Sequence, residues 1–468
     1  MQTTHRHRPA LKSLLLFWLA VSLVFVPLLS PAVLAGETMT YKLLDPEGFS
    51  DAAVDAKAYV LYDAQSGTFL TGKNQDEPLS PASVTKVMTV LLAMENLELT
   101  DKITITRDMF ETIPNDYTRL GLMEGEEVTV EQALYANLLI SANDASMALA
   151  TAVGGSVDNF VTMMNERAVE LGCLDTHFTN PYGFADVDHL TTAHDIALIF
   201  AEVLKYDLYT QIATTRHYLM PATNICSEER GMQNGNKFVS TEQFKYEYYV
   251  GGKTGYTDLS SYTITAGARR DGRTLISVIL GASQSAVRYL GCAALFDYGF
   301  ENFSTVAVDP AEFEEVKDQA VASVTAAIGQ TGSTLVIEDV NLHLDDYLTT
   351  TAKRAASPFS CVMDDQTDLL QTGLASQALQ YPLYLEYGDG TRLPVGLLEI
   401  SIGLAPTEET TVPVPDTPDT RAPVWRIILR VIAIILLVVV VAFCLLLLIA
   451  MIRHDLHKKH RKKPVGRR

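Results

Sequence analysis

The stretch PASVTKVMT, residues 81–89, decides how this chain is interpreted. Apolar residues follow Ser83 at helical spacing, so we predict that Ser83 opens a helix and that Lys86 lies one turn further, on the same face. A lysine amine in that place can accept the serine proton if burial and neighbouring cations lower its pKa. The amino end of the helix also favours negative charge that develops nearby. The stretch therefore predicts a serine nucleophile with a lysine base.

Two further motifs follow along the chain, SAN at 141–143 and KTG at 253–255, and each occurs once. A serine with lysine three residues later also occurs once, at Ser83. Taken alone, each motif is explained as well by a helix cap, a turn between helices or an exposed strand end. In this order, the three predict acyl transfer on a peptide or lactam with a free carboxylate.

The context of the second motif predicts a turn between two buried helices. Thr129 and Gln132 have the spacing of a capping box, and an apolar helix follows them and ends near Ser141. A second apolar helix is expected from about Ala145. Such a turn is a rigid place from which Ser141 and Asn143 can direct a hydroxyl and an amide into a cleft.

The context of the third motif predicts an antiparallel sheet. A strand-like run at 248–250 precedes it, and two more follow at 262–266 and 275–280. Asp271 and Gly272 provide the turn between the last two runs. An extended substrate can lie along the edge strand of this sheet, with main-chain hydrogen bonds setting its register.

The motif residues themselves suit that edge. Lys253 and Thr254 can bind the terminal carboxylate of the substrate. Gly255 has no side chain, so it leaves the edge open for close approach.

Together these residues resemble the penicillin-binding protein and serine β-lactamase superfamily, and more closely the low-molecular-weight D-alanyl-D-alanine carboxypeptidases. Stretches that match this family lie at 176–183, 189–195, 234–237 and 252–258, and the resemblance covers about residues 40–302. It implies an α+β fold. We expect a β-lactamase/transpeptidase-like catalytic domain of antiparallel sheet and helices, then a small β-rich domain and a C-terminal transmembrane helix.

The resemblance also assigns roles to the motif residues. The catalytic residues are Ser83, Lys86 and Ser141, and the substrate-binding residues are Asn143, Lys253, Thr254, Gly255 and Tyr256. It implies that Ser83 forms the acyl ester, Lys86 accepts its proton and Ser141 relays protons to the leaving group. Asn143 would hold the substrate amide, and the backbone N–H groups of Ser83 and Tyr256 would form the oxyanion hole.

The activity implied by the resemblance is removal of the terminal D-alanine from peptidoglycan stem peptides through an acyl-Ser83 intermediate, with β-lactams as inhibitors and no cofactor. The alternatives are a β-lactamase, a DD-endopeptidase and a non-catalytic cell-wall sensor. A class A β-lactamase would need a Glu-x-x-Leu-Asn segment, which does not occur between Ser141 and Lys253, and Glu166 has the surroundings of a surface residue. One departure from the family is that Ser260 and Ser261 replace its usual Ala-Gly.

The ends of the chain predict an exported, membrane-anchored protein. Residues 1–35 have the basic start, apolar stretch and small-residue cleavage site of a signal peptide, with an uncleaved anchor as the alternative. Residues 431–452 carry no charge and are long enough to span a bilayer. The basic residues after them place the C-terminus in the cytoplasm and the catalytic domain outside the cell membrane.

We therefore expect six segments. They are a signal peptide at 1–35, a catalytic domain at 36–302, a small β-rich domain at 303–403, a Pro-rich linker at 404–425, a transmembrane helix at 426–452 and a basic tail at 453–468. Within the β-rich domain, 311–328 could instead be helical.

Composition excludes some classes of function. The net charge is −20, and the two ends are basic, so the part between them is strongly acidic and unsuited to nucleic acid. The five cysteines form no Cys-x-x-Cys pair and are expected to be isolated thiols. His189 and His194 lack an obvious third ligand, so a helix cap formed by Thr191, Thr192 and Asp195 is favoured over a metal site.

Overall fold

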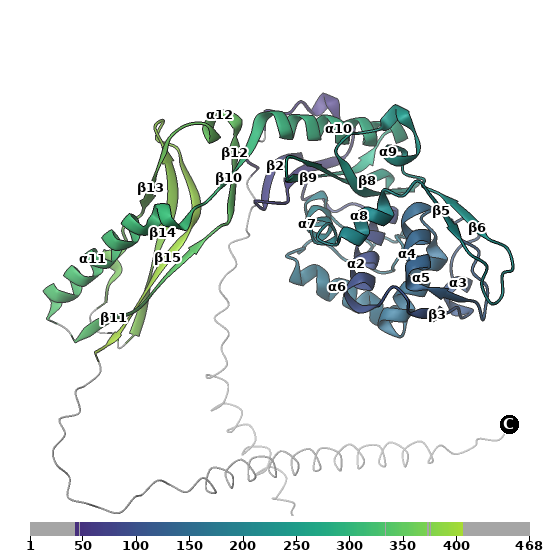
Figure 1. The fold of residues 1–468 in the computed structure, drawn as a ribbon, viewed down its shortest axis with the longest axis horizontal. Coiled ribbons are helices and arrows are strands. Elements are labelled where there is room, and N and C mark those ends of the chain that lie inside the picture. The colour runs from purple at the N-terminus through teal and green to yellow at the C-terminus, as the bar shows by residue number, and fades with distance from the viewer. Residues whose placement is uncertain (1–42, 46, 333, 372–373, 375, 406–468) are drawn as a thin grey trace, which may run out of the picture. The chain divides into compact units, whose positions relative to one another are not determined.

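The computed structural model describes residues 43–405, apart from 46, 333, 372–373 and 375. Its first part is built on a five-stranded antiparallel sheet in the order β2-β1-β9-β8-β7 (Figure 1). The strands are β1 (Ala58–Asp63), β2 (Thr68–Lys73), β7 (Tyr249–Thr257), β8 (Ser261–Arg270) and β9 (Arg273–Ala282). The predicted antiparallel arrangement is confirmed, and β7, which carries the KTG motif, is an edge strand of this sheet.

The turn from β8 to β9 forms where the sequence predicts it. Arg270 pairs with Arg273, and Asp271 and Gly272 both have positive φ, at 53° and 82°. Two consecutive positive φ angles are typical of the two-residue turns whose twist matches that of the strands they join. This turn sets the register of the two central strands.

Helices cover both faces of the sheet. On one face lies α10 (Ser285–Asn302), which packs Tyr289, Leu295 and Phe296 against the strands. Figure 1 shows a larger group of helices on the other face, where a second apolar cluster lies. These helices are α2 (Lys86–Asn96), α3 (Asp108–Glu111), α4 (Val130–Leu139), α5 (Asn143–Gly154), α6 (Val157–Glu170), α7 (Ala193–Val203) and α8 (Asp207–Ala213).

Local capping explains where several of these helices begin. Thr129 and Gln132 form the predicted capping box at the start of α4. The helix after the SAN turn begins at Asn143, two residues before the expected start. Ser83 lies in a 3₁₀ turn, η3 (Ala82–Thr85), and α2 begins at Lys86, so the predicted helix opens with one tighter turn.

Short elements complete this part of the chain. They are η2 (Asp51–Ala53), the paired strands β3 (Lys102–Thr104) and β4 (Glu127–Thr129), the hairpin β5 (His217–Met220) and β6 (Arg230–Gln233), α9 (Lys237–Ser240) and η4 (Glu242–Phe244). The β5–β6 hairpin contacts α4, and Thr223 and Asn224 in its loop form hydrogen bonds with Glu126 and Glu127 before α4.

The part after α10 has an apolar cluster of its own. A four-stranded antiparallel sheet, in the order β11-β15-β14-β13, packs against α11 (Glu314–Thr331), so the helical alternative for 311–328 is the one observed. The elements are β10 (Phe303–Ala307), η5 (Pro310–Phe313), β11 (Leu335–Leu344), β12 (Tyr347–Thr351), α12 (Ala352–Ala355), β13 (Phe359–Met363), η6 (Thr367–Leu369), β14 (Ser376–Tyr387) and β15 (Arg392–Leu404).

The predicted signal peptide, transmembrane helix, basic tail and nearly all of the linker lie outside the described residues. Among the residues that are described, no helix has the length and apolarity needed to cross a membrane.

A buried carboxylate joins the first sheet to the β10–β12 ladder. Asp63, at the end of β1, is fully buried and accepts hydrogen bonds from Arg273 Nε at 2.7 Å, Thr349 Oγ1 at 2.7 Å and Thr305 Oγ1 at 3.2 Å. Arg273 also donates to the carbonyls of Gly299 and Phe303. Removing only one partner of a buried ion pair is costly, because the other charge stays buried without compensation.

We expect Asp63→Ala to lower the free energy of unfolding by about 3–5 kcal/mol, because it leaves the Arg273 guanidinium buried without its counter-charge. Urea unfolding of the purified protein measures this effect. Lys102→Ala is the control, because it breaks an ion pair with Glu127 whose side chains are 67% and 41% exposed, and it should cost about 0–1 kcal/mol. Equal losses from the two variants would contradict the structural role of Asp63.

Candidate active site

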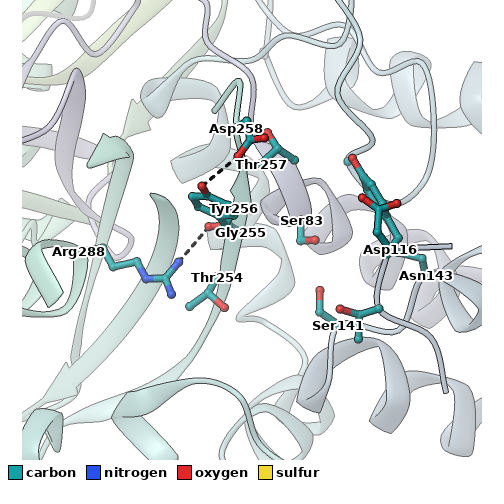
Figure 2. Close-up of a pocket in the computed structure, with 13 residues that line it drawn as sticks. Ser83, Asp116, Ser141, Asn143, Thr254, Gly255, Tyr256, Thr257, Asp258 and Arg288 are labelled. Carbon is teal, nitrogen blue, oxygen red and sulfur yellow. Dashed lines mark hydrogen bonds between the residues drawn. The ribbon is translucent and has the colours of Figure 1, made fainter. Parts of the chain in front are cut away.

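The three motifs meet around one cavity of about 460 Å³ (Figure 2). It is lined by Ser83, Asp116, Tyr117, Thr118, Ser141, Asn143, Gly183, Thr254, Gly255, Tyr256, Thr257, Asp258 and Arg288. Six of the eight predicted site residues are in this set. Lys86 and Lys253 are not, because both are almost completely buried beneath the cavity surface, at 0% and 3% exposure.

Lys86 connects the nucleophile to two other segments. Its Nζ lies 3.0 Å from Ser83 Oγ, 2.7 Å from Asn143 Oδ1 and 2.8 Å from the carbonyl oxygen of Tyr182. The amide oxygen and the carbonyl can only accept hydrogen bonds. A neutral amine has two N–H groups for these two acceptors, which leaves its lone pair directed at the Ser83 hydroxyl. This geometry is suited to a base that removes the serine proton.

The environment of Lys86 supports the neutral form. Burial, and then the positive charge of Lys253, hold the pKa of Lys86 well below that of an ordinary lysine, while Asp144 acts in the opposite direction. Burial disfavours the charged amine because the ammonium loses its hydration. The requirement stated from the sequence, burial together with a neighbouring cation, is therefore met by the fold.

The SAN turn places its two polar side chains differently. Ser141 has φ +58° and its Oγ is buried in the cavity wall without a hydrogen-bond partner among the described residues. It is therefore free to exchange protons with a bound molecule. Asn143 directs its Oδ1 at Lys86, and its backbone N–H donates to the Thr118 carbonyl at 2.9 Å.

Strand β7 approaches the nucleophile turn at the distance of backbone contact. A Cβ added to Gly255 would lie 2.8 Å from the Ser83 nitrogen and 2.5 Å from Thr263 Oγ1. On the other side, a Cβ on Gly183 would lie 1.8 Å from the Ala82 carbonyl oxygen. The Ser83 amide is thus held beside the edge of β7, where the resemblance places the oxyanion hole with Tyr256.

The cationic end of the site has two parts. Lys253 Nζ donates to the Thr254 carbonyl at 2.8 Å, and burial followed by the charge of Arg288 lowers the Lys253 pKa to about 7. Arg288, on α10, lines the cavity and donates to the Gly255 carbonyl at 2.9 Å (Figure 2). An arginine keeps its charge at all working pH values. Arg288 therefore provides a constant positive charge, whereas the charge of Lys253 depends on pH.

Sequence reasoning did not identify Arg288 or the segment at 116–118 as part of the site. Arg288 stands alone on a helix that follows the KTG motif by a whole hairpin, and no local pattern marks it. The carboxylates of Asp116 and Asp258 lie at the exposed rim of the cavity. Only the tertiary fold, which brings α10 and this loop to the cavity that Ser83 lines, shows that they belong to the site.

The departure at Ser260 and Ser261 forms a closed turn. Ser260 Oγ accepts from the backbone N–H of Thr257 at 3.0 Å and donates to the Ser261 carbonyl at 2.9 Å. Ser261 takes φ +55°, a conformation that glycine adopts at lower cost. The strand following the motif continues as β8, so the change is accommodated.

His189 has a structural role beneath the nucleophile turn. Its Nδ1 accepts from the Thr179 N–H at 2.9 Å and its Nε2 lies 2.8 Å from Thr85 Oγ1. Burial lowers its pKa to about 4, so the ring is neutral at neutral pH. Thr192 caps α7 as predicted, by accepting from the Asp195 N–H. Within the described part of the chain, no group of three or more His, Cys, Asp or Glu side chains could hold a metal.

The chain is similar to proteins of one known family. A family model described as D-alanyl-D-alanine carboxypeptidase matches residues 46–284. The chain is 34% identical to D-alanyl-D-alanine carboxypeptidase DacF of Bacillus subtilis, over 56% of this chain and 66% of that protein. It is 31% identical to DacC of Escherichia coli, over 63% of this chain and 71% of that protein.

A solved structure has a similar fold. The crystal structure of a D-alanyl-D-alanine carboxypeptidase from Mycobacterium tuberculosis superposes with a TM-score of 0.50 and 28% identity. The match covers 57% of this chain and 97% of that one. The α+β, transpeptidase-like class expected from the sequence is thereby confirmed for this part of the chain.

We expect Gly255→Ala to slow acylation of Ser83 on the order of 10²-fold, because the new Cβ pushes β7 away from the Ser83 amide. The second-order rate of labelling by a fluorescent penicillin measures this. Gly231→Ala in β6 is the control, because a Cβ there meets nothing within 4 Å. A rate for Gly255→Ala equal to that of the control would contradict the proposed contact.

The pH dependence of the same labelling tests the role of Lys86. In the proposed role, acylation needs neutral Lys86, which predominates above its pKa. The labelling rate should therefore fall on the acid side of its pH profile, and this acid limb should lie well below the pKa of an ordinary lysine. Lys253→Gln removes a positive charge that lowers the Lys86 pKa, so the limb should move to higher pH. Lys205→Gln, on the exposed surface, should leave it in place. A limb that moves to lower pH in Lys253→Gln would refute this assignment.

Proposed function

This chain belongs to the D-alanyl-D-alanine carboxypeptidase family, and we propose that it releases the terminal D-alanine from peptidoglycan stem peptides. The observation that carries the proposal is the buried Lys86 amine, whose lone pair is left for the Ser83 hydroxyl by two obligate acceptors. The family membership supplies the class of substrate. The geometry supports the proposal, because Ser83 and Arg288 line one cavity and Lys86 and Lys253 are buried beneath it.

The first half of the reaction forms an acyl ester. Ser83 Oγ attacks the carbonyl carbon of the penultimate residue and its proton passes to Lys86 Nζ. The Ser83 amide at the edge of β7 stabilises the oxyanion that develops. When the C–N bond breaks, the leaving amine takes a proton through the unpartnered hydroxyl of Ser141, and D-alanine departs.

The second half returns the enzyme to its starting state. A water molecule adds to the acyl ester while Lys86 removes its proton, the bond to Ser83 Oγ breaks, and Ser83 regains a proton. The terminal carboxylate of the substrate would be bound at Thr254, with the fixed charge of Arg288 on the cavity wall and Lys253 beneath. A neutral C-terminal amide would lose this attraction.

We propose that β-lactams acylate the same serine. They present a carboxylate and a strained amide to the same cationic end and nucleophile. A β-lactamase would need rapid deacylation, but no glutamate lines the cavity in the described part of the chain, and Glu166 on α6 is exposed. The site thus favours a long-lived acyl ester with penicillin.

We also propose that the catalytic part works outside the cell, held at the membrane. The support is the sequence of the termini: a signal-like segment at 1–35, an uncharged segment at 431–452 and the basic residues after it. The Pro-rich residues 404–425 would act as a spacer.

Release of D-alanine from a peptide ending in D-Ala-D-Ala tests the proposal. We expect release by the wild-type protein and a fall to background in Ser83→Ala, because the nucleophile is lost. Ser360→Ala, exposed on β13 and not among the residues that line the cavity, is a matched control and should retain activity. Stable penicillin labelling without release would favour a sensor, and release only from cross-linked peptides would favour an endopeptidase.

A further inference from the structure

Asp144 is a buried carboxylate that the reaction described above does not use. It lies in the first turn of α5, directly after the SAN motif, and is 1% exposed. Its two oxygens accept four backbone hydrogen bonds. Oδ1 accepts from the N–H groups of Leu120 at 2.9 Å and Ala145 at 3.0 Å, and Oδ2 from Gly121 at 2.9 Å and Leu122 at 3.0 Å.

Three of these donors, at 120–122, follow closely after residues that line the cavity. The segment 116–122 has no regular secondary structure apart from turns, and its residues Asp116, Tyr117 and Thr118 line the cavity. Figure 2 shows Asp116 across the cavity from Gly255 and Tyr256 of β7. The backbone of such a segment lacks the regular hydrogen bonds of a helix or sheet. The Asp144 carboxylate supplies the missing acceptors, and the Thr118 carbonyl accepts from the N–H of Asn143, the neighbour of Asp144.

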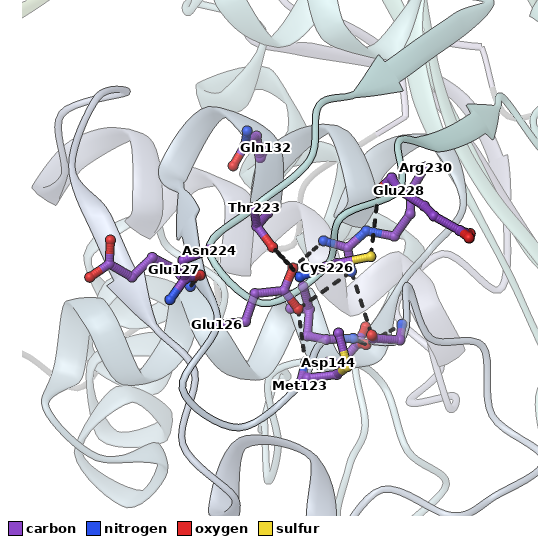
Figure 3. A network of polar contacts seen from close by, with 12 residues as sticks. Met123, Glu126, Glu127, Gln132, Asp144, Thr223, Asn224, Cys226, Glu228 and Arg230 are labelled. Atoms are coloured by element: carbon purple, nitrogen blue, oxygen red, sulfur yellow. Dashed lines mark hydrogen bonds and ion pairs between the residues drawn. The ribbon is translucent and has the colours of Figure 1, made fainter.

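A second buried carboxylate holds the far end of the same segment. Glu126 is fully buried, pairs with Arg230 of β6, and accepts from Thr223 Oγ1 at 2.8 Å and from the Met123 N–H at 3.0 Å (Figure 3). These partners belong to the β5–β6 hairpin and to the end of the loop. Glu126 thus anchors the loop from outside, whereas Asp144 anchors it from the side of the active site.

Asp144 also acts on the base through its charge. Two charged groups influence Lys86, Lys253 on β7 and Asp144 on α5, and the ring centre of Tyr182, in the loop before α7, lies 5.9 Å from Nζ. Among them, Asp144 is the one carboxylate, and its neighbour Asn143 contacts Lys86 directly. The same side chain therefore acts on the cavity wall and on the charge of the base.

We propose that Asp144 is a positioning residue for acylation: it holds the 116–122 segment, whose first three residues line the cavity with Ser83, and it places a negative charge beside Asn143, the residue that contacts Lys86. The inference rests on the proposed function for the identity of the chemical step. Its structural part does not, because the four hydrogen bonds are independent of any substrate. Asp144 raises the Lys86 pKa, whereas Lys253 lowers it. The direction in which the pH dependence moves therefore separates the electrostatic effect of Asp144 from that of Lys253.

The test compares Asp144→Asn with Glu126→Gln. Asparagine keeps the size of the side chain but turns an NH₂ group toward N–H donors, so two of the four bonds are lost. We expect kcat/KM for D-alanine release, and the rate of penicillin acylation, to fall about tenfold or more. The acid limb of acylation should move to lower pH, because the negative charge that raises the Lys86 pKa is gone.

Glu126→Gln is the matched control. It removes an equally buried carboxylate from the same loop, and it should lower stability while leaving the acid limb in place. If both variants leave the limb unchanged, or if Asp144→Asn keeps wild-type rates, the proposal is overturned. Absence of D-alanine release by the wild type would refute the proposed function instead, since the penicillin rates would still report on Asp144.

Hydrogen exchange of the wild-type protein covers the case in which Asp144→Asn does not fold. The amides of Leu120, Gly121 and Leu122 should exchange slowly even though they lie outside helices and strands, because each donates to a buried carboxylate. Exchange as fast as that of exposed turns would overturn the anchoring role.

Discussion

The buried amine of Lys86 is the contact on which the active site depends. It meets atoms from three segments that are distant in sequence: Ser83 in η3, Asn143 at the start of α5 and the Tyr182 carbonyl before α7. A lysine can act as a base near neutral pH only when its charged form is disfavoured, and burial does this. Burying the amine requires the three segments to pack together. The proposed basicity of Lys86 therefore depends on the same packing that holds the helical part of the fold together.

The backbone around the nucleophile is correspondingly tight. Gly255 and Gly183 allow main chain to touch main chain on both sides of the Ser83 turn. Ala82 and Ser141 both take positive φ, at 48° and 58°, although neither is glycine. Such conformations cost free energy and persist where the surrounding structure imposes them. Their position at the cavity indicates that the fold spends stability to orient the two serine hydroxyls.

The charged groups around Lys86 are of two kinds. Lys86, the proposed base, is buried where neighbouring charges act on it strongly. Groups with a constant role are held by hydrogen bonds, as Arg288 is by the Gly255 carbonyl and Asp144 by four backbone amides. The Asp63–Arg273 pair belongs to neither kind, and it joins the five-stranded sheet to the β10–β12 ladder.

The sequence by itself determined the three motifs and the local structure around them. The order of the three motifs, the capping box at Thr129 and the hairpin turn at Asp271 could be predicted because each depends on residues a few positions apart. Tertiary structure alone decided the roles of Arg288, Asp144 and the 116–122 segment, and the burial of Lys253 beneath the cavity. These depend on contacts between distant segments, often through backbone atoms, and backbone atoms are the same in every residue and leave no trace in the sequence.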